Sequence, residues 1–208
     1  MTAPRFITLE GGEGAGKSTQ VRALASRLTD LGHKVTVTRE PGGAPGAEAI
    51  RALLVNGDTG RWTPRAETLL HFAAREDHLA RTIRPALERG AWVISDRFVD
   101  STYAYQGVGQ GVERGEIDAL ASMVIDEDMP VLTLILDLPV EVGLSRAHQR
   151  GGDDRYERMG VEFHIALRNA FLDIAVAHPS RCVVIDATHS VEDVSRHIWK
   201  VVTERVSL

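Results

Sequence analysis

The sequence predicts an α/β fold in which a parallel sheet of five strands is flanked by helices. Short apolar, β-branched runs alternate with longer segments of helical period, which is the pattern of strands joined by crossover helices. A glycine-rich loop directly follows the first of these runs. The chain has 208 residues, of which 43% are apolar and 25% charged, as in ordinary globular proteins. We therefore expect a single domain over residues 1–208.

The predicted strands have five to seven residues each and are mostly apolar on both faces, as expected for strands covered by helices. They are Phe6 to Glu10, Lys34 to Thr38, Ala91 to Ser95, Val131 to Asp137 and Arg181 to Ile185.

The helices follow from apolar spacing and from their stop signals. Between the first two strands, spacings of three and four predict one buried helix face, which Gly32 ends at its C′ position. That face consists of Val21, Leu24, Ala25, Leu28 and Leu31. Further helices are expected over 45–55, 64–89, 113–127, 139–149, 157–177 and 190–205, and Pro85 should kink or divide the one over 64–89.

Two glycines and several charges between the helices at 139–149 and 157–177 predict a mobile lid near 146–158.

Charge and cysteine content exclude several classes of protein. The net charge of −5 argues against a general binder of nucleic acid or of anionic membranes. No apolar run reaches transmembrane length, and the N-terminal apolar stretch is too short for a signal peptide, so we expect a cytoplasmic protein. Cys182 is the only cysteine, which excludes an internal disulfide and a cysteine-built metal site. The eight histidines show no zinc-binding spacing.

The strongest motif directly follows the first strand. The sequence Gly11-Gly-Glu-Gly-Ala-Gly-Lys17-Ser18 matches the phosphate-binding pattern G-x-x-x-x-G-K-[ST]. Its glycines let successive N–H groups converge on phosphate oxygens, and the following helix adds the positive end of its dipole. Lys17 offers a charge to the outer phosphates, and Ser18 offers a hydroxyl to Mg²⁺. The predicted ATP-binding loop consists of Gly11, Gly12, Glu13, Gly14, Ala15, Gly16, Lys17, Ser18 and Thr19.

The loop alone leaves three classes open: a nucleotide switch, an ATPase motor and a phosphoryl transferase. A GTPase would be expected to carry an Asn-Lys-x-Asp guanine-reading motif, and none occurs in the sequence. The small size of the chain and its internal arginines favour the transferase.

Five segments, taken in order and spacing, resemble bacterial thymidylate kinase over essentially the whole chain. They are Phe6 to Ser18, Thr38 to Gly43, Phe72 to Arg75, Asp96-Arg97 and Ser101 to Gly107. The resemblance implies a P-loop kinase that transfers the γ-phosphoryl group of ATP to dTMP, giving dTDP for dTTP synthesis, with Mg²⁺ as cofactor. It also implies a homodimer.

The resemblance places several residues around the reacting phosphates. It assigns Arg97 to the phosphate of dTMP, Asp96 to the water shell of the magnesium ion that the motif gives to Ser18, and Glu13 to the acceptor sugar hydroxyl. A guanidinium suits phosphate, and a strand-end carboxylate suits a hydrated metal. The alternatives are a strand-end ion pair for Asp96 and Arg97 and a solvated loop charge for Glu13.

Other residues are assigned by the same resemblance to the base and sugar of dTMP. Arg75 would read the thymine edge, Thr102 would hydrogen-bond the base, and Tyr105 would exclude a ribose hydroxyl at C2′. Where the family commonly has an aromatic residue one turn before this arginine, the sequence has His71, with Phe72 next to it. Either Phe72 or the imidazole of His71 stacks on the base. We favour Phe72, and a core-facing Phe72 is the alternative.

Further acceptor contacts are expected from Arg39, Pro41, Arg51 and Gln106. For Arg51, a solvated helix charge is the alternative.

The lid supplies the remaining candidates. Family members with a small residue in the phosphate loop supply basic residues from the lid, and Ala15 places this chain with them. Arg150 and Arg155 then become the candidates that bridge donor and acceptor, whereas Arg146 is placed to lie against adenine. Each of these arginines has a solvated lid charge as its alternative.

Asp186 resembles a residue of the loop that packs beside adenine, and Tyr156 and Glu157 are candidate acceptor contacts. Two rival functions remain open: another P-loop nucleoside or nucleoside-monophosphate kinase, and a non-catalytic nucleotide-binding switch.

Overall fold

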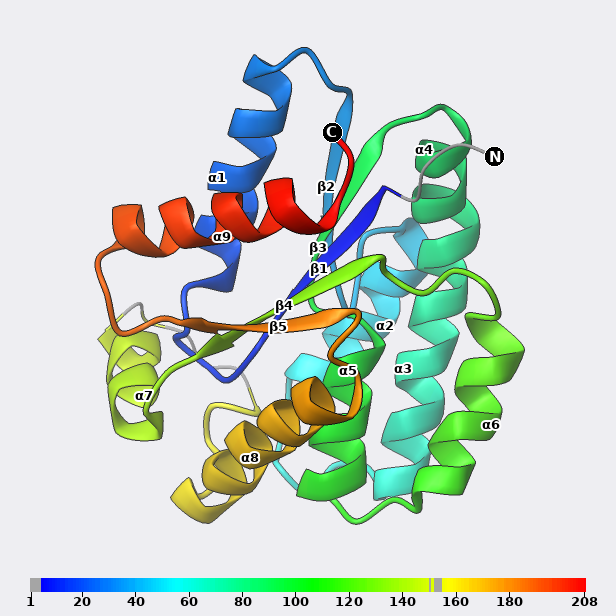
Figure 1. Ribbon diagram of the computed structural model, residues 1–208. Coiled ribbons are helices and arrows are strands. Elements are labelled where there is room, and N and C mark those ends of the chain that lie inside the picture. Colours follow the sequence, from blue (N-terminus) through cyan, green and yellow to red (C-terminus); the bar gives the residue numbers. More distant parts are fainter. Residues whose placement is uncertain (1–4, 150, 152–154) are drawn as a thin grey trace.

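The computed structural model describes residues 5–149, 151 and 155–208. These residues form a five-stranded parallel sheet in the order β2-β3-β1-β4-β5 (Figure 1). The strands are β1 (Phe6–Glu10), β2 (Val35–Arg39), β3 (Trp92–Asp96), β4 (Leu132–Asp137) and β5 (Cys182–Asp186). The predicted α/β fold class is confirmed.

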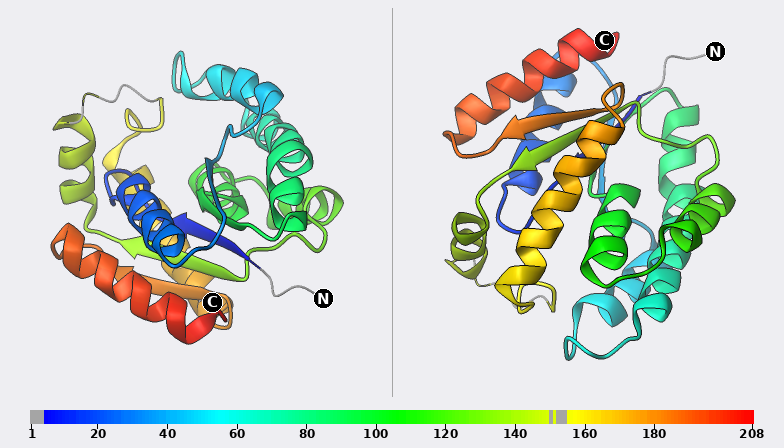
Figure 2. Two further views of the ribbon diagram at one scale, coloured as in Figure 1. Left: turned by 90° about the horizontal axis from the view of Figure 1, so that it is seen from above. Right: turned by 60° about the horizontal axis from the view of Figure 1, so that its bottom comes forward.

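Helices cover both faces of the sheet. Helices α1 (Lys17–Asp30) and α9 (Val191–Arg205) pack on one face. The other face is covered mainly by α3 (Pro64–His78), α4 (Arg84–Glu88), α6 (Arg114–Val124) and α8 (Val161–Ala177). In both views of Figure 2, α9 lies on the opposite side of the sheet from α3 and α6.

The remaining elements lie near the carboxyl ends of the strands. Helix α2 (Pro45–Val55) packs against α3, α5 is the short helix Val99–Thr102, and α7 is the helix Val140–Gln149. Two segments are π-helical: η1 (Leu79–Ile83) and η2 (Tyr103–Gly109). The strands run toward the glycine-rich loop and α7, at the lower left of Figure 1.

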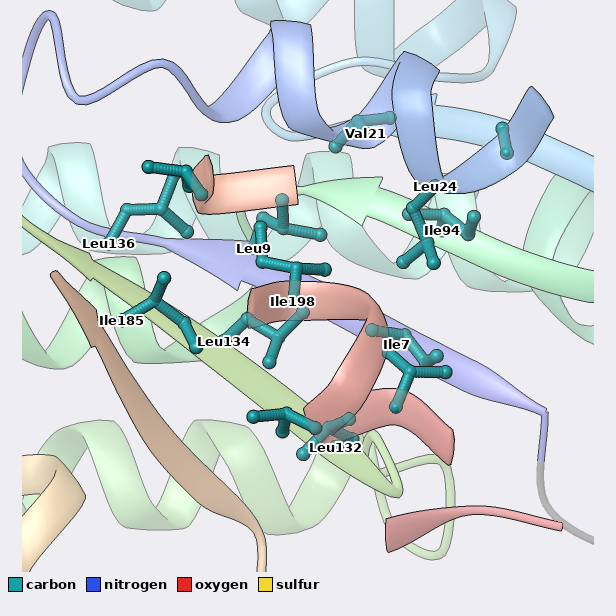
Figure 3. Packing of buried hydrophobic residues seen from close by; sticks show 14 of the residues in the cluster. Ile7, Leu9, Val21, Leu24, Ile94, Leu132, Leu134, Leu136, Ile185 and Ile198 are labelled. Atoms are coloured by element: carbon teal, nitrogen blue, oxygen red, sulfur yellow. The ribbon is translucent and has the colours of Figure 1, made fainter. Parts of the chain in front are cut away.

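The central strand explains why the sheet needs cover on both sides. All five residues of β1 are buried, with Ile7 and Leu9 in the cluster under α1 and α9 and Phe6 in the cluster on the opposite face. Figure 3 shows the first cluster, where Leu24 of α1 and Ile198 of α9 approach the strand side chains. Thr8 lies between these apolar positions, and its hydroxyl is satisfied by the hydroxyl of Thr133 at 2.8 Å.

The first helix ends where the sequence predicts, but its predicted face is one residue too long. Gly32 has a φ of 86°, the left-handed C′ conformation that glycine adopts without strain. Leu31 is 58% exposed, so its assignment to the buried face was wrong. It is the C-cap residue, where the backbone leaves the helix, and the 3.6-residue period no longer directs its side chain.

The long helix predicted over 64–89 is divided, as Pro85 indicated. Helix α3 ends at His78, η1 follows, and Pro85 lies in the first turn of α4. Proline has no N–H to donate and clashes with the carbonyl four residues earlier, which favours an irregular turn at this point.

Two further helix boundaries differ from expectation. Helix α8 begins at Val161 rather than 157, because residues 155–159 form turns that close the lid segment. Helix α6 ends at Val124, three residues earlier than predicted. Within the described part of the chain, no helix is both long and apolar enough to span a membrane.

Candidate active site

The glycine-rich loop packs closely on α7. Gly14 has a φ of 67°, and a Cβ atom there would lie 2.0 Å from the carbonyl oxygen of Gly143 in α7. A side chain at Gly14 is therefore excluded both by backbone strain and by contact. This close approach fixes the loop between β1 and α1, with its backbone in the left-handed region again at Gly16.

Lys17 begins α1 and is folded back over the loop. Its Nζ donates to the carbonyl oxygens of Gly11 at 3.1 Å and Gly12 at 2.7 Å. Burial, and then the neighbouring Arg97, lower the pKa of Lys17 to about 8. The ammonium group is thus held directly beside the cradle where phosphate groups would lie.

Ser18 and Asp96 meet beside Lys17. The hydroxyl of Ser18 donates to Oδ2 of Asp96 at 2.5 Å, which joins the start of α1 to the end of β3. Among the described residues, no three His, Cys, Asp or Glu side chains form a metal-binding group. One carboxylate and one hydroxyl do fit Mg²⁺ when substrate phosphates complete its oxygen shell.

Arg97 follows β3 in a constrained conformation. Its φ is 74°, which is uncommon for a residue with a side chain and marks a backbone held in place by its surroundings. Its guanidinium donates to the Gly11 carbonyl oxygen at 2.9 Å and to Oε1 of Glu13 at 2.8 Å. The arginine is therefore bound to the glycine-rich loop while it faces the cleft.

Glu13 forms the other half of this ion pair. Burial alone would raise its pKa, but Arg97, Lys17 and a hydrogen bond from the Tyr105 hydroxyl lower it to about 2. Burial raises the pKa of Tyr105 well above its usual value, so the phenol keeps its proton and donates to Glu13 at 2.5 Å. Glu13 is thus an ionised acceptor that holds both Arg97 and Tyr105.

One cleft of about 470 Å³ contains most of the predicted site residues, and this volume is suited to small-molecule ligands. At its phosphate end it is lined by Glu13, Gly14, Ala15, Gly16, Lys17, Ser18, Thr19, Asp96 and Arg97. At its other end it is lined by Arg39, Pro41, Arg51, His71, Arg75, Thr102, Tyr105 and Gln106. Gly11 and Gly12 do not line the cleft and instead hold Lys17.

Arg75 lies at the far end of the cleft with one free nitrogen. Its Nε donates to Glu40 at 2.8 Å and its Nη2 donates to the Thr102 hydroxyl at 3.0 Å. Its Nη1 is buried and has no hydrogen-bond partner among the residues that the structure describes. A ligand carbonyl oxygen at this end of the cleft would satisfy that donor.

The structure corrects the preference for Phe72. Phe72 is 2% exposed and belongs to the core cluster beneath β3, so it does not face the cleft. One helical position earlier, His71 does line the cleft. The ring of Phe72 instead packs 4.8 Å from the guanidinium of Arg75. Phe72 and His71 both lie within one turn of Arg75, but they point about 100° apart around α3, so that Phe72 enters the core while His71 and Arg75 line the cleft.

His71 is a neutral group. Burial, and then Arg75 and Arg155, lower its pKa to about 3. Its Nε2 lies 3.0 Å from the hydroxyl oxygen of Tyr156, the hydrogen of which is donated to Glu67. Because that hydrogen is committed, His71 must donate from Nε2.

This neutral histidine predicts a loss of stability in acid. Its folded pKa of about 3 lies below the ordinary value of 6.5, so unfolding takes up a proton as the pH falls below 6.5. Between pH 7.5 and pH 4.5 we expect the free energy of unfolding to fall by about 2 to 3 kcal/mol more in the wild type than in His71→Phe. Urea unfolding at both pH values measures this. Equal losses in the two proteins would show that His71 is not held neutral.

Arg155 is not the exposed lid cation that the sequence suggested. It is 1% exposed, outside the cleft wall, and its guanidinium pairs with Glu67 and donates to the carbonyl oxygens of Leu54 and Thr59. A charged side chain that is buried must be paired, and Glu67 provides the pair. The second lid candidate, Arg150, lies outside the described residues.

The adenine candidates are not brought to the cleft either. Arg146 is exposed on α7. Asp186 accepts hydrogen bonds from the backbone N–H and the hydroxyl of Thr188, as in a local turn.

Sequence reasoning missed several residues of the cleft and its surroundings. Arg22 lines the cleft one helical turn after Ser18, and Glu40, inside the motif that ends β2, holds Arg75. Glu67 lies four residues before His71 on the face of α3 that His71 and Arg75 share. Helical spacing could have found Arg22 and Glu67, because residues four apart share a face.

Comparison with known proteins identifies the family. The family model of thymidylate kinase matches residues 9–198. A thymidylate kinase of Caulobacter vibrioides is 58% identical over the full length of both chains. One from a Bradyrhizobium species is 52% identical over 97% of this chain and 91% of that protein. The crystal structure of a thymidylate kinase from Ehrlichia chaffeensis matches with a TM-score of 0.77 and 37% identity, covering 95% of this chain and 97% of that one.

The match to the family model and to the relative from Caulobacter vibrioides spans nearly the whole chain, including every residue of the cleft. The protein belongs to the thymidylate kinase family.

Proposed function

We propose that the cleft described above holds ATP and dTMP end to end, so that the γ-phosphoryl group passes directly between them. The protein is an ATP-dependent kinase that phosphorylates dTMP to dTDP in dTTP synthesis. The observation that carries the proposal is the position of Arg97, which is bound to the glycine-rich loop and lines the same cleft as Arg75 and Tyr105.

The donor half is built from the glycine-rich loop. Its backbone N–H groups, the N-terminus of α1 and Lys17 would hold the phosphates of ATP. Ser18 and Asp96 would hold Mg²⁺, which supplies positive charge against the donor phosphates when it is bound.

The acceptor half needs no general base. The attacking oxygen belongs to a phosphate that is already anionic, so the requirement is to offset the repulsion between two anions. Arg97 meets this requirement, and Arg39 and Arg51 add positive charge on the same wall. Arg150 of the lid is our candidate for the bridging cation between donor and acceptor.

The base end supplies the preference for thymine. The unpartnered Nη1 of Arg75 would donate to a carbonyl oxygen of thymine, while Thr102 and Gln106 face the same space. His71 provides an aromatic face next to Arg75. Cytosine carries an amino group where thymine has a carbonyl, and that group could not accept a hydrogen bond from Arg75.

Tyr105 would select deoxyribose by excluding a 2′-hydroxyl. We expect dTMP to be preferred over its ribose analogue by about tenfold or more, and Tyr105→Ala to reduce that preference to about threefold or less. The measurement is the ratio of kcat/KM for the two acceptors.

Tyr105→Phe separates the ring from the hydroxyl, because it keeps the ring and removes only the bond to Glu13. It should retain most of the preference. If Tyr105→Ala discriminates as well as the wild type, the ring is not the sugar sensor.

A homodimer in the cytosol is also part of this proposal. Leu69 of α3 and Met123 of α6 are 51% and 74% exposed on neighbouring helices, and such apolar side chains favour burial against a second copy. Analytical ultracentrifugation would distinguish a dimer from a monomer.

The function is tested by ADP formation with different acceptors. Formation should depend on an added acceptor and be fastest with dTMP, compared with dUMP, UMP, CMP and thymidine. A switch protein would bind nucleotide and show no dependence on an acceptor. A higher kcat/KM for any of the other acceptors would instead assign a different nucleoside or nucleoside-monophosphate kinase.

A further inference from the structure

Glu67 is a fully buried carboxylate just behind the acceptor end of the cleft. It lies on α3 at 0% exposure and does not line the cleft itself. Its Oε1 accepts hydrogen bonds from Gln106 at 2.9 Å, Gln110 at 2.6 Å and the Tyr156 hydroxyl at 2.8 Å. Its Oε2 accepts from Arg155.

These four donors come from two separate parts of the chain. Gln106 is in η2 and Gln110 directly follows it, whereas Arg155 and Tyr156 lie near the end of the predicted lid segment, 146–158. A buried carboxylate is stable only when its lone pairs are filled, so Glu67 requires all of these groups to converge on α3.

Arg155 extends this convergence to a third segment. In addition to Glu67, its guanidinium donates to the carbonyl oxygens of Leu54 at 2.9 Å and Thr59 at 3.0 Å. The backbone N–H of Arg155 donates to the carbonyl oxygen of Val55 at 3.0 Å. The end of α2, the loop after it and the end of the lid segment are therefore tied to one carboxylate.

Two of the four donors are themselves part of the cleft wall. Gln106 and Tyr156 both line the cleft, and the Tyr156 ring packs edge-on against the Tyr105 ring at 5.3 Å between centroids. The Tyr156 hydroxyl also contacts His71, and because its hydrogen goes to Glu67 it fixes which nitrogen of His71 carries the proton. Glu67 thus determines the orientation of side chains that face the acceptor.

We propose that Glu67 is a positioning residue for acceptor binding, which holds Gln106, Tyr156 and the end of the lid segment in the arrangement that receives the base and sugar of dTMP. The inference rests on the proposed function, since it concerns the acceptor end of the same cleft. Glu67 acts through its neighbours and does not touch the substrate.

The donor end of the cleft provides an internal comparison, because its side chains make their hydrogen bonds to groups other than the Glu67 carboxylate. The side chains of Lys17 and Ser18 donate to Gly11, Gly12 and Asp96, and the hydrogen bonds that Glu67 accepts come from other segments. A loss of Glu67 should therefore change the KM for dTMP far more than the KM for ATP, whereas general loosening of the fold would affect both.

Glu67→Gln is the direct test. An amide oxygen has two lone pairs and cannot keep three strong hydrogen bonds, and the new NH₂ group would face the Arg155 guanidinium. We expect the KM for dTMP to rise about tenfold or more, with the KM for ATP within about twofold of the wild type. A KM for dTMP within about twofold of the wild type would overturn the inference.

Glu76→Gln is the matched control. Glu76 lies on the same helix, but it is half exposed and pairs with Arg84 at the surface. The same chemical change there should leave both KM values unchanged. If Glu76→Gln raises the KM for dTMP as much as Glu67→Gln does, the effect belongs to α3 in general and the inference fails.

A second variant keeps the test decisive if Glu67→Gln does not fold. In Glu67→Gln/Arg155→Met the unpaired buried cation is removed, and a neutral replacement of a buried ion pair is often tolerated. The KM for dTMP should remain raised, because one of the three bonds to the oxygen is still lost. An unchanged KM for dTMP in this variant would overturn the inference.

Failure of the inference is distinguishable from failure of the proposed function. If wild-type ADP formation does not respond to dTMP, the function is wrong. If the wild type responds and the Glu67 variants keep its KM for dTMP, only the positioning role is wrong.

Discussion

Replacing Lys17 by alanine is expected to abolish phosphoryl transfer while dTMP binding stays nearly unchanged. The ammonium group lies over the glycine-rich loop, 3.1 and 2.7 Å from the carbonyl oxygens of Gly11 and Gly12, at the donor end of the cleft. Its charge is needed where negative charge shifts during transfer, and such preorganised groups are worth several kcal/mol. We expect kcat to fall by at least about 1000-fold, with the Kd for dTMP within about twofold. Initial rates and calorimetric titration measure the two quantities.

Lys200→Ala provides the control for removing a lysine. Lys200 is exposed on α9 and pairs only weakly with Glu204, at 3.9 Å. Its loss should change neither quantity. If the kcat of Lys17→Ala is close to the wild-type value, the glycine-rich loop does not take part in phosphoryl transfer.

Replacing Arg97 by methionine should have a comparable effect on the acceptor side. Arg97 would bind the dTMP phosphate, and its loss also leaves the partly buried Glu13 carboxylate without its ion-pair partner. We expect kcat/KM for dTMP to fall by about 1000-fold or more, which corresponds to about 4 kcal/mol. The KM for ATP should change much less.

Arg97→Lys separates charge from shape. A lysine keeps a positive charge near Glu13, but it cannot contact the Gly11 carbonyl, Glu13 and a phosphate through one planar group. We expect it to recover about tenfold of the lost kcat/KM and no more. Full activity of Arg97→Met would show that the acceptor phosphate binds elsewhere.

The sequence was sufficient to predict the fold because its signals are local. The apolar run at Phe6 to Glu10, the loop that follows it and the stop at Gly32 each depend on a few neighbouring residues, and the structure shows all three. The cleft residues that follow strands were found for the same reason. Asp96 and Arg97 come directly after β3, whose carboxyl end meets the glycine-rich loop at one edge of the sheet.

The sequence was insufficient wherever a side chain's surroundings come from distant segments. Arg155 is charged and lies in a polar stretch, and only the fold reveals that Glu67, 88 residues earlier, receives it in the interior. The choice between His71 and Phe72 depended on a rotation of α3 by one residue. That rotation is set by packing of Phe72 in the core and not by local preference.

The most direct test of the account is the stereochemistry of transfer. The account requires one direct displacement between two nucleotides bound in one cleft, with no phosphorylated side chain between them. With ATP made chiral at the γ-phosphorus and dTMP as acceptor, the product dTDP should therefore show inversion of configuration at that phosphorus. Retention would mean two displacements through a phosphorylated enzyme, and would contradict the arrangement in which Lys17 serves the donor and Arg97 the acceptor.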